Sequence, residues 1–366
     1  MSEKKTIFIT GTTGLLGSYL LKILLENGHK VYALARNKNE KAAKDRVKEA
    51  LSFWDDKVIA KYSDNLIVLD GDITEQNLGL KKENIELLRK EIEEIFHCAA
   101  LTKLNSPLES SRKVNVEGTK NILELCCDWN NRGKLKKVNH ISTIFIYGDY
   151  QNIFQENNLD VGQKFNTFYE QTKFEAEKLI GEYRNKGLWI DIFRPCAIIG
   201  ESFTGKIPSL SYALHQLIHI WSKGLLDYFP QGYFLKAVCV DELSRSIFYI
   251  SSKSLEKNKT YHPFGYDSLS LVELLNLSVE HFKFKKLYIV SKEEFVSKST
   301  PLQVMLLKHN IFFINTNVKA ASEATNKFLK YYNFEFSQFT KPLLFNILAY
   351  AIKTGFIMKS KERHKD

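Results

Sequence analysis

Hydrophobic positions in the first half of the chain form short continuous runs separated by longer stretches of helical period. The predicted strands occupy residues 7–9, 30–35, 65–70, 94–100, 136–143 and 189–193, and apolar runs such as 7–9 are typical of strands buried on both faces. Between them, apolar residues recur three or four positions apart, which predicts helices near residues 15–24, 39–53, 111–129 and 167–185. This alternation predicts an α/β fold with a Rossmann-type, doubly wound parallel sheet and ligands at the carboxyl ends of its strands.

A glycine-rich turn follows the first predicted strand. Gly11, Gly14 and Gly17 stand between the run 7–9 and the helix that begins at Leu15. Gly11 permits a tight turn, Gly14 lets backbone N–H groups approach a pyrophosphate, and Gly17 allows close packing of the helix on the strand. The amino end of that helix directs a partial positive charge to the same place. The motif therefore predicts a nucleotide site with contacts from Gly11, Thr12, Thr13, Gly14, Leu15 and Leu16.

The residue at the end of the second predicted strand indicates which dinucleotide the site binds. Folds that bind NAD favour an acidic residue there, whereas this chain has Arg36, which can pair with a 2′-phosphate. We therefore expect NADP(H). Asp72, after the third strand, is placed to accept from an adenine amine, although a turn alone would also explain it. Ala99 and Ala100 are small enough for the backbone to approach a dinucleotide. The remaining expected cofactor contacts are Ile73, Lys173 and Pro195.

Tyr169 and Lys173 carry the candidate chemistry. They lie four residues apart, on one face of a predicted helix. A free tyrosine has a pKa near ~10, and the Lys173 ammonium and an oxidised nicotinamide are expected to lower it. Thr143, at the end of the fifth strand, offers a hydroxyl to a substrate oxygen. A phenol, an ammonium and a hydroxyl at this edge of a dinucleotide fold suit hydride transfer to a carbonyl.

The periodic pattern stops near Gly200. We expect residues 1–205 to form the NADP-binding domain and residues 206–366 to form mainly a substrate-binding region. The segment 236–250 begins a helix that is expected to pack back onto the first domain. Further helices are predicted near residues 268–282 and 320–331.

Composition narrows the partners and the compartment. The 366 residues carry a formal net charge of +10, but no basic stretch with interleaved aromatic residues predicts binding to nucleic acid. None of the five cysteines forms a Cys-x-x-Cys pair and no N-terminal signal is visible, so we expect reduced thiols, no metal and a cytoplasmic protein. The apolar segment 343–352 is too short to span a bilayer. Basic residues follow it at positions 359–365, so the end of the chain could contact a membrane surface. The pattern nevertheless favours a terminal helix packed against the protein.

These motifs together resemble the extended short-chain dehydrogenase/reductase family over residues 5–205. The resemblance rests on the glycine motif, Asn115, Thr143, Tyr169 and Lys173, and it makes Thr143 the match to the family's catalytic Ser/Thr, with Ser142 as the alternative. Further segments resemble the thioester-reductase and fatty-acyl-reductase branch, although Cys239 stands where proline is usual. These segments are residues 71–74, 77–80, 97–100, 115–119, 194–200, 204–205 and 240–242.

The resemblance implies an NADPH-dependent reductase of an acyl thioester, which yields an aldehyde and sometimes the alcohol. Thr143 and Tyr169 would donate to the carbonyl oxygen, Lys173 would hold the ribose, and Asn115 would anchor a water relay. Because the chain lacks the length for adenylation or carrier domains, we expect a CoA thioester or a carrier protein acting in trans. Carrier proteins are typically acidic, which suits a partner of net charge +10.

Other functions of the same fold remain open. A reductase or dehydrogenase of free carbonyls or alcohols would use the same side chains. A nucleotide-sugar epimerase or dehydratase would also use them, but it usually retains NAD through an acidic residue where Arg36 stands. A non-catalytic NADPH sensor typically lacks the tyrosine that is present here as Tyr169.

Overall fold

The computed structural model describes residues 3–210, 213–311 and 320–357, and its contacts divide the chain into two compact units. The first, here called the sheet unit, comprises Met1–Cys196, Leu243–Pro263 and Lys319–Phe334. The second unit comprises Ala197–Glu242, Phe264–Val318 and Glu335–Asp366. The chain therefore leaves the sheet unit after Cys196 and returns to it twice.

Seven parallel strands form the centre of the sheet unit, in the order β11-β6-β5-β4-β1-β2-β3. From β1, the chain first builds β2 and β3 on one side and then β4, β5 and β6 on the other. This is doubly wound topology, and it confirms the predicted fold class. The bounds are β1 (Thr6–Thr10), β2 (Lys30–Ala35), β3 (Leu66–Asp70), β4 (Glu94–His97), β5 (Lys137–Ile141), β6 (Ile190–Phe193) and β11 (Thr260–Tyr261).

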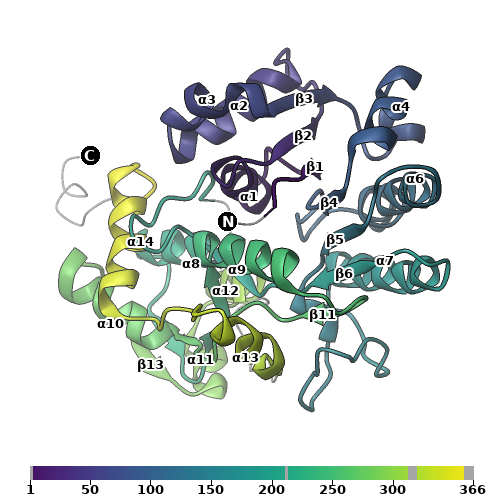
Figure 1. Cartoon of the computed structure of the whole chain (residues 1–366). Helices are drawn as coiled ribbons and strands as arrows, with labels where there is room; N and C mark the ends of the chain where they lie inside the picture. Colours follow the sequence, from purple (N-terminus) through teal and green to yellow (C-terminus); the bar gives the residue numbers. More distant parts are fainter. Residues whose placement is uncertain (1–2, 211–212, 312–319, 358–366) are drawn as a thin grey trace. The chain divides into compact units, whose positions relative to one another are not determined.

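Helices cover both faces of this sheet, which is why its strands are continuous apolar runs. Figure 1 shows α4, α6 and α7 along one face and α1 and α9 along the other. In the core, the ring of Phe8 in β1 lies edge-on to Trp129 of α6, with ring centroids 5.9 Å apart. The helices of this unit are α1 (Leu15–Glu26), α2 (Ala43–Trp54), α3 (Lys57–Tyr62), α4 (Lys82–Glu91), α5 (Leu108–Arg112), α6 (Gly118–Arg132), α7 (Phe168–Asn185) and α13 (Glu323–Tyr331). Helix α9 (Val240–Lys253) belongs to the sheet unit from Leu243 onward.

Two predicted helices differ from the structure. The helix expected from residue 39 begins at Ala43, because Lys38 and Lys41 exchange backbone hydrogen bonds and Asn39 and Glu40 turn the chain with φ of 49° and 62°. The helix expected over 111–129 is interrupted by a π-helical turn, η3 (Lys113–Glu117), between α5 and α6. Such a turn accommodates one extra residue and often marks a functional site.

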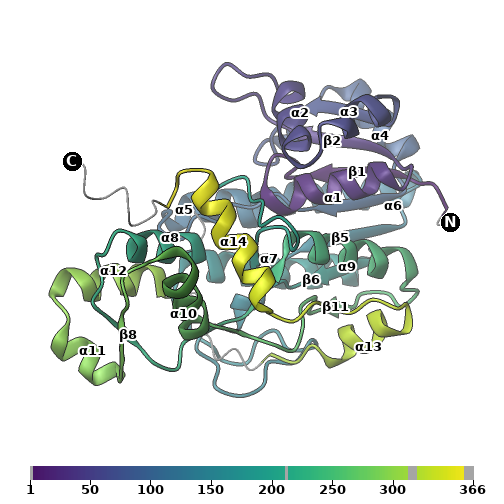
Figure 2. The same ribbon diagram turned by 90° about the vertical axis from the view of Figure 1, so that its left-hand side faces the viewer.

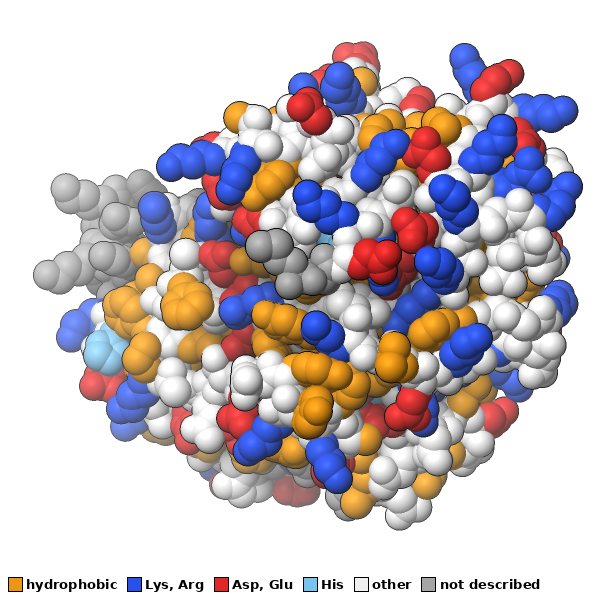
Figure 3. Space-filling view, in the orientation of Figure 1, with side chains coloured by type: hydrophobic (Ala, Val, Ile, Leu, Met, Phe, Trp, Pro, Cys, Tyr) orange, Lys and Arg blue, Asp and Glu red, His pale blue; other side chains and the backbone are white. Residues whose placement is uncertain are grey.

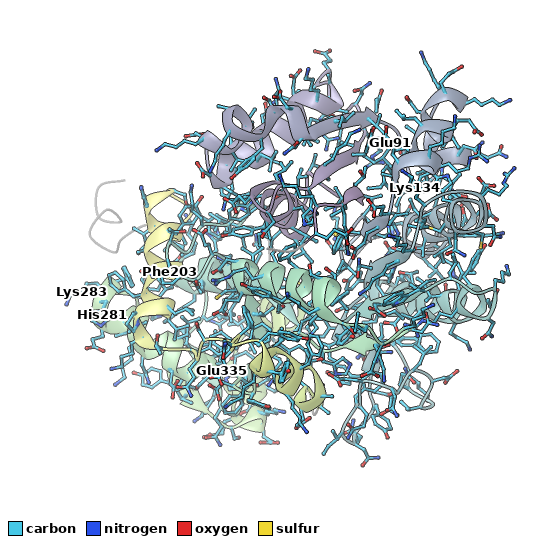
Figure 4. The ribbon with its side chains drawn as sticks, in the orientation of Figure 1. Glu91, Lys134, Phe203, His281, Lys283 and Glu335 are labelled. Atoms are coloured by element: carbon cyan, nitrogen blue, oxygen red, sulfur yellow. The ribbon has the colours of Figure 1, made fainter. Side chains whose placement is uncertain are left out.

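Ion pairs secure the amino ends of the strands. Glu91, at the end of α4, accepts from the Lys30 ammonium at 2.6 Å and from the Tyr32 hydroxyl at 2.7 Å. Figure 4 shows Lys134 near Glu91. The hydrogen bond from Lys30 is the main reason why the pKa of Glu91 lies below its usual range. At the start of β4, Glu94 pairs with Lys5 at 2.8 Å. These charges are structural, and the candidate chemistry lies at the opposite ends of the strands.

The second unit combines short strand pairs with helices around a separate core, which includes Trp221 and Phe229. Its pairs are β7 (Ala197–Ile199) with β10 (Ala237–Cys239), β8 (Tyr228–Pro230) with β13 (Tyr288–Val290), and β9 (Phe234–Leu235) with β12 (Leu269–Ser270). Its further helices, seen in Figure 2, are α8 (Ala213–Ser222), α10 (Leu271–Phe282), α11 (Lys292–Lys298), α12 (Pro301–Ile311) and α14 (Lys341–Lys353).

The apolar segment near the end of the chain is α14, and its hydrophobic face is packed into the core of the second unit. Leu343, Leu344, Ile347, Leu348 and Ala351 are all buried. Among the described helices, none has the length and hydrophobicity needed to cross a bilayer. The basic residues 359–365, which the peripheral-contact prediction also needs, lie outside the described residues.

Candidate active site

The glycine turn after β1 needs glycine at two positions. Gly11 has φ of +75°, and a Cβ on it would lie 2.6 Å from the Ala99 nitrogen. A Cβ on Gly17 would lie 2.2 Å from the Gly11 carbonyl oxygen. The Gly14 amide donates to that oxygen at 3.0 Å, which closes the turn. These contacts bring the backbone of the turn against β4, as a phosphate cradle requires.

The first turn of α1 is open to an anion. Gly14 caps the helix without a side-chain hydrogen bond, so no side chain competes for the amide groups there. Leu15 and Leu16 are buried and anchor this turn in the core. Thr12 is also buried and donates to the Leu34 carbonyl at 3.3 Å, which ties the turn to β2. The cradle therefore fits the pyrophosphate of a dinucleotide.

Two arginines lie beside this turn. Arg36 is half exposed and its guanidinium donates to the Asp72 carboxylate at 3.0 Å. Arg46, on α2, donates to the Arg36 carbonyl and, at 3.4 Å, to the Thr13 hydroxyl. Burial raises the pKa of Asp72, but hydrogen bonds from Thr74 and Arg36 outweigh it and hold that pKa below its usual value. Sequence reasoning missed Arg46, although its place early in the helix after the second strand was a usable signal.

A series of hydrogen bonds through His97 connects the loop after β4 to the π-helical turn. The Ala99 amide donates to the Thr10 hydroxyl at 3.2 Å, and Thr10 Oγ1 lies 2.8 Å from His97 Nδ1. On the other side, His97 Nε2 lies 3.1 Å from Thr119 Oγ1, which itself donates to the Asn115 carbonyl at 2.7 Å. Since the Thr119 proton is used, His97 Nε2 carries a proton and Nδ1 accepts. His97 is thus a neutral link between the Ala99 loop and the π-helical turn.

The remaining predicted cofactor contacts border the same region. Ala99 and Ala100 are half-buried in the loop after β4. Ile73 is buried beside Gly118, and its carbonyl accepts from Asn121 at 2.8 Å. The Pro195 carbonyl accepts from the Ile144 amide at 2.9 Å. Pro195 thereby joins the segment after β6 to the segment after β5.

Asn115 lies in the π-helical turn and its side-chain amide joins three segments. Its Oδ1 accepts from the Leu101 amide at 2.7 Å, and its Nδ2 donates to the Leu101 carbonyl at 3.1 Å and to Thr172 Oγ1 at 3.0 Å. Both amide protons are therefore used within the protein. The amide fixes the loop after β4 to α7, directly beside Lys173.

Thr143 and Tyr169 meet at the carboxyl end of β5. The Thr143 hydroxyl lies close enough to the Tyr169 phenol to influence its pKa. Thr143 also caps the short helix η4 (Ile144–Tyr147), where its Oγ1 accepts from the Phe145 amide at 3.3 Å, and it lies 3.4 Å from the Pro195 carbonyl. The hydroxyl of Ser142 is buried without a hydrogen-bond partner. The geometry therefore favours Thr143 over Ser142 as the partner of the phenol.

Lys173 is buried one helical turn after Tyr169. Its Nζ donates to the Ile141 carbonyl at 2.6 Å and lies 3.3 Å from His140 Nε2. Burial lowers the pKa of Lys173 to about 8, although the charge of Glu177 on the same helix raises it. The carboxylate of Glu177 is committed to Arg194 at 2.7 Å. The ammonium is thus held chiefly by neutral acceptors.

Tyr169 departs from the sequence-based expectation that a nearby ammonium lowers its pKa. Burial raises the pKa of Tyr169 to about 12, and the nearby Thr143 hydroxyl offsets only part of this effect. The charge of Glu170 raises the pKa of Tyr169 further. The phenol therefore keeps its proton at neutral pH, which is the form that donates to a carbonyl oxygen.

Two further observations concern metal ions and nucleic acid. In the described part of the chain, no three His, Cys, Asp or Glu side chains are grouped as a metal ion would need. On the face viewed in Figure 3, Lys and Arg side chains are interleaved with Asp and Glu over the described residues. This distribution does not resemble the continuous basic stripe typical of nucleic-acid binding.

Comparison with known proteins shows the same fold and family. A chain that covers 98% of this one, the terminal reductase domain of the myxalamid biosynthetic pathway, superposes with a TM-score of 0.82 at 24% identity, over 93% of its own length. The thiolation-reductase di-domain of an archaeal non-ribosomal peptide synthetase gives a TM-score of 0.83 at 20% identity, over 98% of this chain and 77% of the di-domain. Both likenesses are below 25% identity and show the fold.

A sequence relative shares more identity over a shorter region. The carboxylic acid reductase of Segniliparus rugosus is 30% identical over 227 residues, which cover 56% of this chain and 19% of the reductase. The chain thus matches about a fifth of that protein. Residues 9–247 match the male sterility protein family. The chain therefore belongs to the male sterility protein family, a family of NAD(P)-binding proteins.

Proposed function

We propose that this protein uses NADPH to reduce an acyl thioester, bound to a carrier protein or to CoA, to an aldehyde. One observation carries the proposal: the Thr143 hydroxyl lies close enough to the Tyr169 phenol to influence its pKa, and Lys173 is one helical turn from Tyr169. This constellation lies at the carboxyl edge of a sheet whose glycine turn can cradle a dinucleotide. The family of the chain supports the same reaction class.

The choice of NADPH rests on Arg36 and Arg46. The Arg46 guanidinium lies beside Thr13 of the glycine turn, and the Arg36 guanidinium is paired with Asp72 after β3. These two cations are proposed to bind the 2′-phosphate on the adenosine ribose. Asp72 neutralises part of the charge of Arg36. We therefore propose that Arg36 and Arg46 together, rather than Arg36 alone, recognise the phosphate. Asp72 remains our proposed acceptor for the adenine amine.

The chain's own groups suit a reduction. When bound, NADPH supplies the hydride. Tyr169, which holds its proton at neutral pH, gives that proton to the carbonyl oxygen, and the Thr143 hydroxyl donates to the same atom. Negative charge grows on this oxygen in the transition state, so donors already in place lower the barrier. The resulting hemithioacetal loses the thiol and leaves an aldehyde.

Lys173 and Asn115 complete the proposed site. The Lys173 ammonium is proposed to hold the ribose and to favour transfer of the Tyr169 proton. Asn115 positions the helix that carries both residues through its hydrogen bond to Thr172, and its π-helical turn is the proposed anchor of a water relay.

The thioester partner is proposed from charge and from similarity. A chain of net charge +10 attracts an acidic carrier protein, and one matching structure is described as a thiolation-reductase di-domain. CoA is also strongly anionic and remains an equal candidate.

A substrate panel tests this function. NADPH consumption is measured with acyl-CoA, with acyl groups on a carrier protein, with free aldehydes and ketones, and with nucleotide sugars. We expect consumption only with thioesters, or with thioesters and the aldehydes they yield. Consumption with free carbonyls but with no thioester would exclude thioester reduction. Conversion of a nucleotide sugar without net NADPH consumption, measured by chromatography of the sugar, would indicate an epimerase or dehydratase.

A further inference from the structure

The buried ammonium of Lys173 depends on a histidine that lies behind it. Lys173 is 1% exposed, and its Nζ is surrounded by the Ile141 carbonyl at 2.6 Å and by His140 Nε2 at 3.3 Å. Within the described part of the chain, Lys173 forms no ion pair with a carboxylate, since Glu177 binds Arg194. A neutral imidazole is therefore one of two hydrogen-bond acceptors that hold this charge.

The protonation state of His140 follows from this geometry. An ammonium can only donate, so Nε2 must accept and the ring proton must lie on Nδ1. Burial, together with the charge of Lys173, holds the pKa of His140 well below its usual value. The ring is therefore neutral at any pH at which the enzyme would work, and a charged imidazolium at this place would oppose the ammonium.

The other groups around the pair are also uncharged or already bound. His97 lies beside His140 with ring centroids 5.3 Å apart, and burial lowers its pKa to about 3. Burial raises the pKa of Cys98 to about 12, so its thiol stays protonated. From α7, Arg184 donates to the Ile190 carbonyl at 2.7 Å. Arg184 keeps its charge in this bond, and burial, Lys173 and Arg184 together lower the pKa of His140.

We propose that His140 is a positioning residue: its neutral imidazole accepts from the Lys173 ammonium through Nε2 and keeps that ammonium charged and oriented one helical turn from Tyr169. This inference rests on the proposed function, because Lys173 matters to turnover only if Tyr169 and Lys173 act as proposed. His140 itself touches no reacting atom in this account.

Replacement of the acceptor tests the proposal through the pH profile. His140→Phe keeps a buried ring and removes the acceptor, so Lys173 should lose its proton at lower pH. We expect the alkaline limb of NADPH-dependent turnover to move down by about one pH unit, since one hydrogen bond to a charged group has roughly that effect. Turnover well above pH 8 should fall about tenfold, whereas turnover at pH 7 should fall only by about half. His140→Gln, whose carboxamide oxygen can accept from Lys173, should restore both.

A matched control separates this effect from loss of packing. His29 is another buried, neutral histidine of the sheet unit, and it lies at the amino edge, where its Nδ1 accepts from the Lys5 amide at 3.1 Å. His29→Phe should lower the melting temperature and leave the alkaline limb unchanged. If His140→Phe behaves like His29→Phe, His140 is merely structural and the proposal is wrong.

A second measurement does not depend on turnover. Nitrogen NMR of the full chain labelled with ¹⁵N-histidine, with His140 assigned through His140→Gln, reads the tautomer directly. We expect a neutral ring with an unprotonated Nε2, whose resonance moves in Lys173→Met. A protonated Nε2 would overturn the proposal, and so would an Nε2 resonance that does not move in Lys173→Met. Both outcomes can be observed even if the protein has no thioester activity. Absence of turnover in the wild type, with the expected NMR result, would instead contradict the proposed function alone.

Discussion

The guanidinium of Arg36 and the carboxylate of Asp72 form an ion pair of 3.0 Å at the edge of the predicted nucleotide site. The two residues end neighbouring parts of the sheet, since Arg36 follows β2 and Asp72 follows β3. Such a half-exposed pair contributes little to stability by itself. The ion pair does hold the Arg36 side chain in place. Arg46, whose guanidinium donates to the Arg36 carbonyl, reaches the Thr13 hydroxyl. Arg46 thus lies next to the glycine turn, where we propose that it binds the 2′-phosphate.

Loss of Arg46 should weaken NADPH more than NADH. In Arg46→Ala, we expect the dissociation constant of NADPH to rise about tenfold or more, because one charge-assisted hydrogen bond to a phosphate is lost. Affinity for NADH, which lacks the 2′-phosphate, should change little. Titration of both nucleotides by fluorescence checks this. Lys44→Ala, which removes an exposed charge from the same helix, is the control, and equal weakening of both nucleotides in Arg46→Ala would show that Arg46 does not read the phosphate.

Removal of the Tyr169 hydroxyl should abolish most turnover. A general acid contributes roughly 10²–10⁴-fold, so Tyr169→Phe is expected to lower kcat by about that factor and to leave NADPH affinity unchanged. Tyr183→Phe, which changes another buried tyrosine of α7, should retain activity. Stopped-flow or steady-state rates with the preferred thioester give the comparison. A Tyr169→Phe enzyme with near-normal kcat would refute the acid role.

The pH dependence of turnover should follow Lys173. Because the pKa of Lys173 is lowered to about 8, its ammonium predominates below that pH and is lost above it. Tyr169, with a pKa raised to about 12, stays protonated throughout. Turnover is therefore expected to fall as the pH rises through about 8, in a profile of kcat against pH. A rate that stays constant well beyond this pH would show that the charge of Lys173 is not needed.

Stability should depend strongly on the buried pair of Arg194 and Glu177. Both side chains are 1–2% exposed, with Arg194 Nη2 2.7 Å from Glu177 Oε2. Arg194→Met leaves a buried carboxylate without its partner, which typically costs about 3–5 kcal/mol. Urea unfolding measures the loss, and the double variant with Glu177→Met should recover much of it.

The exposed pair of Arg132 and Asp128 is the control for this prediction. Arg132→Met should change the free energy of unfolding by less than about 1 kcal/mol. An Arg194→Met protein as stable as Arg132→Met would mean that Glu177 finds water or another partner.

The fold of the sheet unit could be predicted because its signals are local. The apolar runs that become β1 and β2 lie in strands of five and six residues and are bounded by polar or glycine residues. The π-helical turn at Asn115 could not be predicted, because it depends on hydrogen bonds from Asn115 to Leu101 and Thr172, which lie 14 and 57 residues away. In the second unit, strands of two or three residues are too short to show an alternating pattern.

The candidate site was predictable in part for the same reason. Tyr169 and Lys173 are related by helical spacing, and Thr143 by its place at a strand end. His140 carries no such signal, since its meaning comes from its contact with Lys173 across the fold. Arg46 could have been found from its place early in the helix after the second strand, but its contacts with Thr13 and the Arg36 carbonyl could not. The roles of all these residues in binding and catalysis remain predictions.

The most direct test of the central claim is the amount of thiol released for each NADPH consumed. The full chain is incubated with its preferred thioester, the free thiol is quantified with a chromogenic reagent, and the carbonyl product is trapped with a hydrazine. Our account predicts one thiol and one trapped aldehyde for each NADPH oxidised. NADPH oxidation without stoichiometric thiol would contradict it, because the thioester bond would then remain intact.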